Sequence, residues 1–222
     1  MELQVKGEGA EDYEEVMMIY RGALEQMQTK LNILNEEFQY TNKYNPIEHI
    51  KVRLKTAESI VKKLRRHGYE STLENMVKYC NDIAGVRVIC DFTSDIYKIA
   101  DMISNQSDIR VLAIKDYIAN PKPSGYKSYH MIVTVPVYLS NRIVDTRVEI
   151  QIRTIAMDFW ASLEHKIQYK FTGQVPEQIA KELLECAEMV SDLDEKMLYL
   201  NNEVQELTNL SSEEKDQQSK TR

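Results

Sequence analysis

The chain has 222 residues, of which 43% are hydrophobic and 28% are charged, and its formal net charge is −7 at pH 7. These values are ordinary for a folded globular protein, and the acidic balance argues against a general nucleic-acid binder. There is no apolar run near the ~20 residues of a membrane-spanning helix and no signal-peptide core. Three cysteines without metal-site spacing fit reduced thiols. We therefore expect a cytoplasmic protein with no membrane partner.

Apolar side chains at alternating steps of three and four predict a first helix from about Glu11 to Phe38. Residues 1–10 before it are expected to form a flexible N-terminus. Asn45 and Pro46 mark a break, and a proline suits the first position of a second helix because its missing N–H would be unpaired there anyway. The buried stripe of this second helix would run from Ile47 to Leu64.

The middle of the chain alternates between helical patterns and short aliphatic runs that predict strands. Ser71 and Glu74 fit a capping box for a short third helix. The runs predict four strands at about 85–90, 109–118, 129–137 and 144–153, with an amphipathic helix over 94–107 and a Pro/Gly loop over 119–127. Thr154 is expected to cap a further helix from Ile155 to Phe171.

The last predicted helix follows Pro176 and carries an apolar stripe from Ile179 to Leu207, in steps of four and three over four heptads. Such a stripe indicates helix–helix association, within or between subunits, at least as strongly as packing on the protein's own sheet. Residues 211–222 are polar and are predicted to be a disordered tail. The expected fold is α/β (α+β), with a mixed β-sheet, flanking helices and long helices at both termini of a single domain over 11–210.

One strand combines an aliphatic face with a face rich in functional groups. Alternate residues of a strand point to opposite sides, so Arg147, Glu149, Gln151 and Arg153 share one face. The same pattern is typical of a surface strand with a solvated outer face. The alternation alone leaves these two interpretations at even odds, and the neighbouring motifs decide between them.

Three neighbouring motifs carry groups that suit a phosphorylated ligand. Seven basic residues and one acid lie between Lys51 and Arg66, and such a row can clamp a polyphosphate, although an isolated basic face is more often solvated. Asp82, at a strand entrance, suits a magnesium carboxylate but equally a helix cap. In the loop before residue 128, Gly125 allows unusual backbone shapes and Tyr126 can stack on a base, although composition alone favours an ordinary Pro/Gly loop. Walker A and Rossmann motifs are absent from the sequence, so a nucleotide enzyme without a P-loop is expected.

Four ordered segments resemble the synthetase domain shared by RelA/SpoT proteins, and in particular the small alarmone synthetases of the RelQ type. They are Asp82–Arg87 (DIAGVR), Ser124–His130 (SGYKSYH), Val148–Arg153 (VEIQIR) and Trp160–His165 (WASLEH). The resemblance implies a nucleotidyltransferase-like core, a homotetramer and Mg²⁺-dependent transfer of pyrophosphate from ATP to the ribose 3′-OH of GDP or GTP, giving AMP and ppGpp or pppGpp. The sequence has no His-Asp dipeptide, the hydrolase signature of the family, so a synthetase without hydrolase activity is expected.

The resemblance also implies a role for individual residues. On the ATP side, Arg53 and Arg87 would flank the adenine, and the phosphates would be held by Lys55, Ser59, Lys63 and Arg66. Asp82 would bind Mg²⁺. On the acceptor side, Tyr126 would stack on guanine, with Lys122, Lys127, His130 and Gln151 placing GDP or GTP. Glu149 would lie near the 3′-OH as general base or share the metal, and the sequence leaves both roles open.

Some features keep alternatives open. Asp158, His49 and Lys51 depart from the pattern of relatives in which nearby positions form an inter-subunit cleft that binds (p)ppGpp as an activator, so such activation is less secure than catalysis. A nucleotidyltransferase that transfers NMP and releases pyrophosphate would fit the same fold. A non-catalytic RNA-binding module is a third hypothesis, although the acidic net charge leaves RNA at most a regulatory part.

Overall fold

The computed structural model of the chain describes residues 9–42, 44–168 and 175–220. Five strands form one mixed sheet in the order β1-β2-β5-β4-β3. They are β1 (Ile47–Leu54), β2 (Ala84–Cys90), β3 (Arg110–Asp116), β4 (Tyr129–Tyr138) and β5 (Ile143–Thr154). β2 and β5 run parallel, and the other neighbouring pairs are antiparallel. The predicted fold class is therefore confirmed.

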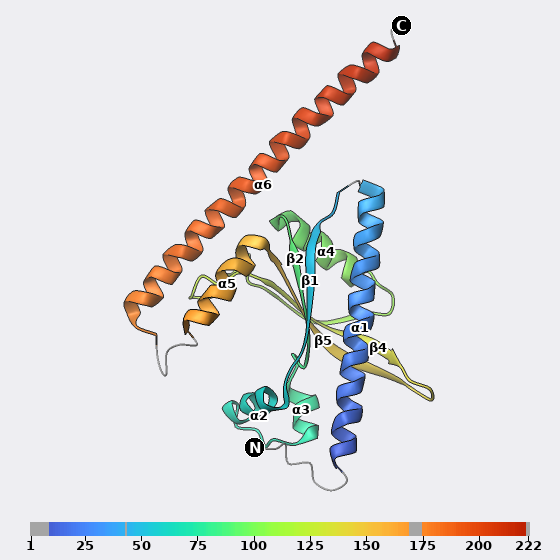
Figure 1. Ribbon diagram of the computed structural model, residues 1–222, viewed down its shortest axis with the longest axis vertical. Helices are drawn as coiled ribbons and strands as arrows, with labels where there is room; N and C mark the ends of the chain where they lie inside the picture. Colours follow the sequence, from blue (N-terminus) through green and yellow to red (C-terminus); the bar gives the residue numbers. More distant parts are fainter. Residues whose placement is uncertain (1–8, 43, 169–174, 221–222) are drawn as a thin grey trace.

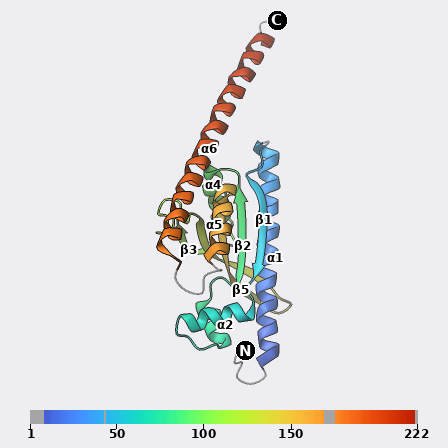
Figure 2. The same cartoon turned by 60° about the vertical axis from the view of Figure 1, so that its left-hand side comes forward.

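Six helices surround the sheet. They are α1 (Gly9–Asn42), α2 (Ala57–Arg66), α3 (Leu73–Tyr79), α4 (Thr93–Ser104), α5 (Ile155–Gln168) and α6 (Glu177–Lys220). α1 and α6 flank the sheet from opposite sides, and α6 projects well beyond it (Figures 1 and 2). No helix in the described part of the chain is long and apolar enough to cross a membrane.

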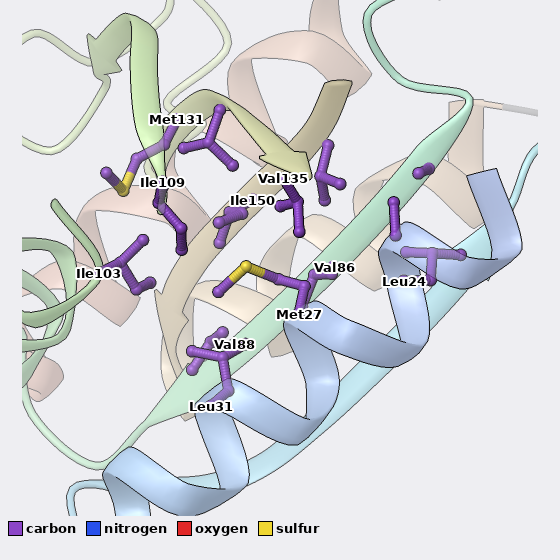
Figure 3. Close-up of a cluster of buried hydrophobic side chains, with 14 of the residues drawn as sticks. Leu24, Met27, Leu31, Val86, Val88, Ile103, Ile109, Met131, Val135 and Ile150 are labelled. Atoms are coloured by element: carbon purple, nitrogen blue, oxygen red, sulfur yellow. The ribbon is translucent and has the colours of Figure 1, made fainter. Parts of the chain in front are cut away.

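The main core lies between α1, α4 and one face of the sheet. Leu24, Met27 and Leu31 of α1 point at the aliphatic side chains of the central strands (Figure 3). Val86 and Ile150 on those strands are almost completely buried. Burying each of these side chains stabilises the fold by about 1.5–3 kcal/mol, which fixes the strand register. The functional groups that alternate with them on β2 and β5 are thereby fixed on the other face.

The structure corrects the prediction of a second helix beginning at Pro46. Residues 47–54 form β1, which pairs with β2, and only residues 57–66 are helical. The pairing register shifts between Ile47 and His49, as at a β-bulge. A bulge adds one residue to the strand, so Ile47 and Ile50 acquire a spacing of three that imitates a helix. After the bulge, Ile50 and Leu54 alternate with outward-facing basic residues, as in any strand.

Smaller differences concern element ends. The N-cap of α3 is Thr72, whose hydroxyl accepts a hydrogen bond from Asn75 N at 3.2 Å, instead of the predicted Ser71. The cap of α5 by Thr154 is confirmed, with Met157 N 3.1 Å from its hydroxyl. α6 is helical as far as Lys220, so its end does not coincide with the boundary predicted near residue 210. Residues 1–8 of the expected flexible N-terminus, and 169–171 of the predicted fifth helix, lie outside the described residues.

α6 meets the sheet through α5. Trp160 of α5 is buried beside Leu183 and Ala187 of α6, and its indole N–H donates to the Leu183 carbonyl at 3.0 Å. Thr154, at the end of β5, donates to the buried carboxylate of Asp194 at 2.7 Å. The first part of α6 is thus anchored to the end of the strand that carries Glu149.

Candidate active site

The sheet aligns the predicted site residues in rows across its open face. Backbone pairing places Arg53 of β1 opposite Gly85 of β2, and Gly85 opposite Glu149 of β5. A pocket between these strands is lined by Lys51, Val52, Arg53, Gly85, Val86, Arg87, Glu149 and Gln151. The small Gly85 leaves the floor of this pocket open between Arg53 and Glu149.

The neighbouring row is made of larger polar groups. Arg87 of β2 lies opposite Gln151 of β5, which in turn lies opposite His130 of β4. Lys51 extends the row on β1, and Lys115 extends it on β3. The interpretation of the open face of β5 as the wall of a site, instead of a solvated surface, is supported by this convergence.

Asp82 and two lysines that bind it form a cationic corner at the entrance to β2. Each of its carboxylate oxygens accepts from one lysine, Oδ2 from Lys55 and Oδ1 from Lys63, both at 2.7 Å. Burial disfavours the charged carboxylate, but the two lysines outweigh burial and hold the pKa of Asp82 below its usual value. One carboxylate held by two ammonium groups leaves a net positive corner, which suits an anionic ligand. Lys55 comes from the β1–α2 connection and Lys63 from α2.

The other predicted phosphate ligands lie on the same short helix. Thr56 caps α2 and donates its hydroxyl proton to Ser59 at 2.9 Å. Lys63 and Arg66 follow Ser59 at helical steps of four and three, so the three side chains share one face of α2. Ser59 and Arg66 are exposed, whereas Lys63 reaches Asp82.

The loop before β4 carries a compact aromatic and cationic cluster. Gly125 has φ +85°, and its N–H donates to the Lys122 carbonyl at 2.8 Å, closing a tight turn. The Tyr126 ring has the Lys122 ammonium 4.5 Å from its centre and the Arg153 guanidinium 5.1 Å from it. A base that stacks on this ring would replace a cation, and the exposed Lys122 is the one free to swing away.

Glu149 is held in place by its neighbours on the sheet. Its Oε2 accepts from the Gln151 amide at 3.0 Å, and its Oε1 lies 3.8 Å from Nδ1 of His130. Gln151 is itself fixed, because its amide oxygen accepts from Arg153 at 3.1 Å. A carboxylate so oriented can accept a proton from a ligand in the pocket or share a metal ion.

His130 is neutral in this setting. Burial and then the positive charge of Arg153 lower its pKa to about 3, with further contributions from Lys122, Lys115 and Arg87. The 3.8 Å approach to Glu149 is therefore not an ion pair. The Tyr126 hydroxyl accepts from Arg153 at 2.5 Å and forms a second hydrogen bond with His130 Nε2 at 2.8 Å. Tyr126 thus links the ring of His130 to Arg153.

The central ion pair of the site joins two residues to which the sequence gave no catalytic or substrate-binding role. Arg153 and Asp158 are joined at 3.0 Å, and Asp158 also binds Arg87 at 3.0 Å. Arg153 stood on the polar face predicted for β5, and Asp158 follows it by five residues at the start of α5. The sequence does contain a signal for this pair. The predicted helix follows the strand directly, so Asp158 in its first turn lies close to Arg153 at the end of the strand.

Two other basic residues point away from the pocket. Lys127 reaches across to the hydroxyl of Ser191 on α6, so the structure does not bring this predicted acceptor ligand together with Tyr126 and His130. Arg147, on the same face of β5 as Glu149, donates to the Val77 and Lys78 carbonyls at the end of α3, at 3.2 and 3.1 Å. It thereby braces the segment that leads to Asp82.

Comparisons with known proteins agree with this geometry. Residues 52–174 match the model of the region found in RelA / SpoT proteins. The GTP pyrophosphokinase YwaC of Bacillus subtilis is 50% identical over 194 residues, covering 87% of this chain and 92% of YwaC. The chain belongs to the RelA/SpoT family.

Solved structures support this membership of the RelA/SpoT family. The small alarmone synthetase 2 of Bacillus subtilis superimposes with a TM-score of 0.77 at 49% identity, covering 84% of this chain and 97% of that chain. The small alarmone synthetase 1 of the same organism, bound to its product pppGpp, gives a TM-score of 0.80 at 37% identity, covering 87% and 98%. Its structure bound to AMPCPP gives 0.74 at 36% identity, covering 88% and 99%.

In the fold, three of the four RelA/SpoT segments converge on the open face of the sheet. They contribute Asp82 and Arg87 through β2, Tyr126 and His130 through β4 and its loop, and Glu149 through β5. The fourth segment, at Trp160, instead supports α6. The family resemblance and the physical arrangement thus select the same side of the sheet.

Proposed function

We propose that the protein is a (p)ppGpp synthetase, a GTP/GDP diphosphokinase that transfers pyrophosphate from ATP to the 3′-OH of GDP or GTP. The observation that carries this proposal is the position of Glu149. Its strand lies between a cationic corner made by Lys55, Lys63 and Asp82 and the aromatic loop at Tyr126. A site with a polyphosphate corner on one side, a base-stacking residue on the other and a carboxylate between them suits transfer between two nucleotides.

On the donor side, the pocket edge formed by Arg53 and Arg87 would flank the adenine of ATP. Ser59, Lys63 and Arg66 of α2, with Lys55 before it, would hold the triphosphate. AMPCPP, the ligand of the solved small alarmone synthetase 1, is an ATP analogue, which supports a donor site of this class. Phosphoryl-type transfer depends on positioning and charge stabilisation, and these cations supply both.

On the acceptor side, Tyr126 would stack on guanine, with Lys122, His130 and Gln151 placing GDP or GTP. The 3′-oxygen attacks the β-phosphorus of ATP, the bond from that phosphorus to the α–β bridging oxygen breaks, and AMP leaves. The 3′-OH proton passes to the Glu149 carboxylate, which Gln151 keeps oriented. Lys127 is omitted from this set because it binds α6.

Asp82 and Glu149 are the residues that would hold Mg²⁺. Mg²⁺ in nucleotide sites is bound by one or two carboxylates plus substrate phosphates. Glu149 lines the pocket and Asp82 lies at the entrance to the neighbouring strand β2, and these two carboxylates fit that donor set. In the described part of the chain no three His, Cys, Asp or Glu side chains gather into a metal site of their own, which fits an ion carried in with ATP. When bound, Mg²⁺ neutralises charge on the transferred group.

The remaining expectations belong to the same proposal. The sequence has no His-Asp dipeptide, which supports a synthetase without hydrolase activity. We place the protein in the cytoplasm as a homotetramer. We also propose two regulators, which are RNA and a (p)ppGpp molecule bound in an activating cleft between subunits. His49, Lys51 and Asp158 depart from the pattern of relatives with such a cleft, so activation is less secure than catalysis.

The deciding experiment is incubation with Mg·ATP and GDP or GTP, followed by chromatographic identification of the products. AMP together with ppGpp or pppGpp is expected, whereas release of pyrophosphate would indicate nucleotidyl transfer. Salt-sensitive RNA binding without turnover would favour the RNA-binding module.

Glu149→Gln tests the role of the central carboxylate, because it removes the charge and preserves the shape. Turnover should fall by about 10²–10⁴-fold, the usual contribution of a general base, with unchanged thermal unfolding. Glu37→Gln, the same exchange on an exposed part of α1, is the matched control and should leave turnover unchanged. Near-normal turnover in Glu149→Gln would exclude the assignment.

A further inference from the structure

Arg153 is almost completely buried, and it contacts the proposed acceptor residues Tyr126 and Gln151 from behind the pocket lining, of which it is not a part. Its side chain is 5% exposed and donates to four different groups. Nη1 donates to Asp158 at 3.0 Å, Nη2 to the Tyr126 hydroxyl at 2.5 Å and to the Gln151 amide oxygen at 3.1 Å, and Nε to the Ser128 hydroxyl at 3.3 Å. Three of these partners lie on the acceptor side of the site.

Asp158 connects the same guanidinium to the donor side. One of its oxygens, Oδ1, accepts from both Arg153 and Arg87 at 3.0 Å, and Lys51 approaches the other oxygen at 4.0 Å. Arg87 lines the pocket beside Arg53, and its Nε has no hydrogen-bond partner. A single buried carboxylate therefore holds one arginine from each side of the site.

The charges of Arg153, Arg87 and Asp158 explain why the two arginines need the carboxylate between them. Two guanidinium groups that converge on one point repel each other, and burial adds a desolvation cost for each. Burial and then the charge of Arg153 lower the pKa of Arg87, whereas Asp158 opposes them. Without the negative charge of Asp158, the two arginines would separate, and their contacts to Tyr126, Gln151 and the pocket would change with them.

We propose that Arg153 and Asp158 are positioning residues that couple the two halves of the active site, Arg153 by fixing the Tyr126 hydroxyl and Gln151, and Asp158 by tying Arg153 to Arg87. The inference rests on the proposed function, since it takes Arg87 as a donor residue and Tyr126 as an acceptor residue. It adds two residues that touch neither nucleotide. Binding on one side should therefore affect affinity on the other through this ion pair.

A double-mutant cycle tests the first link. Arg153→Lys keeps the charge but replaces a fork of donors with one nitrogen, and Tyr126→Phe removes only the hydroxyl. Each single variant should lower kcat/KM for GDP by about tenfold, and the double variant should lower it no further than about tenfold, because both remove the same contact. The KM for ATP should stay near the wild-type value in both single variants. Fully additive losses, near hundredfold, would overturn the proposal.

Asp158→Asn tests the second link, because it removes the charge without changing the shape. It should weaken both AMPCPP and GDP in binding titrations, and the affinity of one nucleotide should no longer depend on the presence of the other. The matched control is Asp145→Asn, which removes a carboxylate from an exposed pair between Asp145 of β5 and Arg110 of β3, and which should change neither affinity. Loss of affinity for only one nucleotide in Asp158→Asn would overturn the coupling.

Folding and function are separated by two further measurements. Circular dichroism and thermal unfolding report whether Arg153→Lys folds. If it does not, the cycle is run with Asp158→Asn and Tyr126→Phe, which act through the same guanidinium and should also be non-additive. If wild-type protein transfers no pyrophosphate, the proposed function fails, while titrations with GDP and AMPCPP still decide whether the two sides are coupled.

Discussion

His130 shows how the site sets the protonation of a single residue. Five charged groups surround it, and four of them are cations: Arg153 on β5, Lys122 in the loop, Lys115 on β3 and Arg87 on β2, with Glu149 as the one anion. Burial, and then the charges of these cations, lower the pKa of His130 from its ordinary value of 6.5 to about 3. The ring is therefore neutral at any pH well above 3. A neutral ring forms no ion pair with Glu149 throughout the physiological pH range.

This shift predicts a specific pH dependence of stability. Between pH 6.5 and about 3 the unfolded chain binds a proton at His130 that the folded protein does not, so the free energy of unfolding falls on acidification. One proton changes that free energy by up to about 1.4 kcal/mol per pH unit. His130→Gln should therefore show a shallower loss of stability than wild type in urea unfolding between pH 6.5 and 4.5. The exposed His49→Gln is the control, and equal slopes for His130→Gln and wild type would contradict the assigned shift.

At this scale the sequence predicted which side chains share a face better than it predicted the partners of those side chains. Alternation along β5 was sufficient to group Glu149 with Gln151, since strand geometry fixes faces. It could not show that both oxygens of Asp82 are taken by Lys55 and Lys63, because that contact depends on the packing of α2. It also could not show that Lys127 contacts Ser191, because Ser191 lies 64 residues later in the chain, on α6.

At the scale of elements, the loop that carries Tyr126 packs against α6. Gly125 packs so closely that a Cβ there would lie 2.5 Å from the Cβ of Ala187 and 3.1 Å from Leu184. Lys127 adds its contact to Ser191 on the same helix. The loop that carries Tyr126 is thus shaped by a helix distant in sequence, and a glycine is required there for both its φ of +85° and its lack of a side chain.

Gly125→Ala tests this docking, with Gly68→Ala as a matched control. Both glycines have positive φ, +85° and +78°, so alanine at either costs about 1–2 kcal/mol of backbone strain. Only Gly125 has a neighbour in the way, because nothing lies within 4 Å of a Cβ at Gly68. Gly125→Ala should also raise the KM for GDP by about tenfold by displacing Tyr126, measured in initial-rate kinetics. A comparable change of KM in Gly68→Ala would show that loop docking is not the cause.

The strands show which elements a sequence can predict. β2, β4 and β5 were predicted within one or two residues, because their aliphatic runs are bounded by polar or Gly-containing segments. β1 was missed because its bulge gives Ile47 and Ile50 a helical spacing. Strand order was not predictable, since the parallel pair of β2 and β5 joins residues such as Gly85 and Glu149, which are far apart in the chain.

For the whole molecule, the apolar stripe of α6 divides into a packed half and an open half. Leu183 and Val190 pack against the Trp160 cluster. Beyond them the stripe continues along α6, which projects past the sheet (Figure 1), with the exposed side chains Leu193, Met197, Leu200, Val204 and Leu207. A contiguous row of large apolar side chains is typical of a protein–protein contact, and its heptad spacing fits a partner helix. This supports the proposed homotetramer, in which α6 would pair with another copy.

Charge placed in this row should weaken assembly. Leu200→Glu puts a carboxylate where a partner helix would bury it. Burying this unpaired charge would cost several kcal/mol of association free energy, roughly enough to dissociate the helix pair. Sedimentation or light scattering should then report a species smaller than the tetramer expected for wild type, while circular dichroism stays unchanged. Asn202→Glu adds the same charge at an exposed polar position of α6 and should preserve the wild-type assembly. The proposed catalytic residues Glu149 and Asp82 lie in one chain, so the smaller species should still transfer pyrophosphate. An unaltered mass in Leu200→Glu would show that assembly uses another surface.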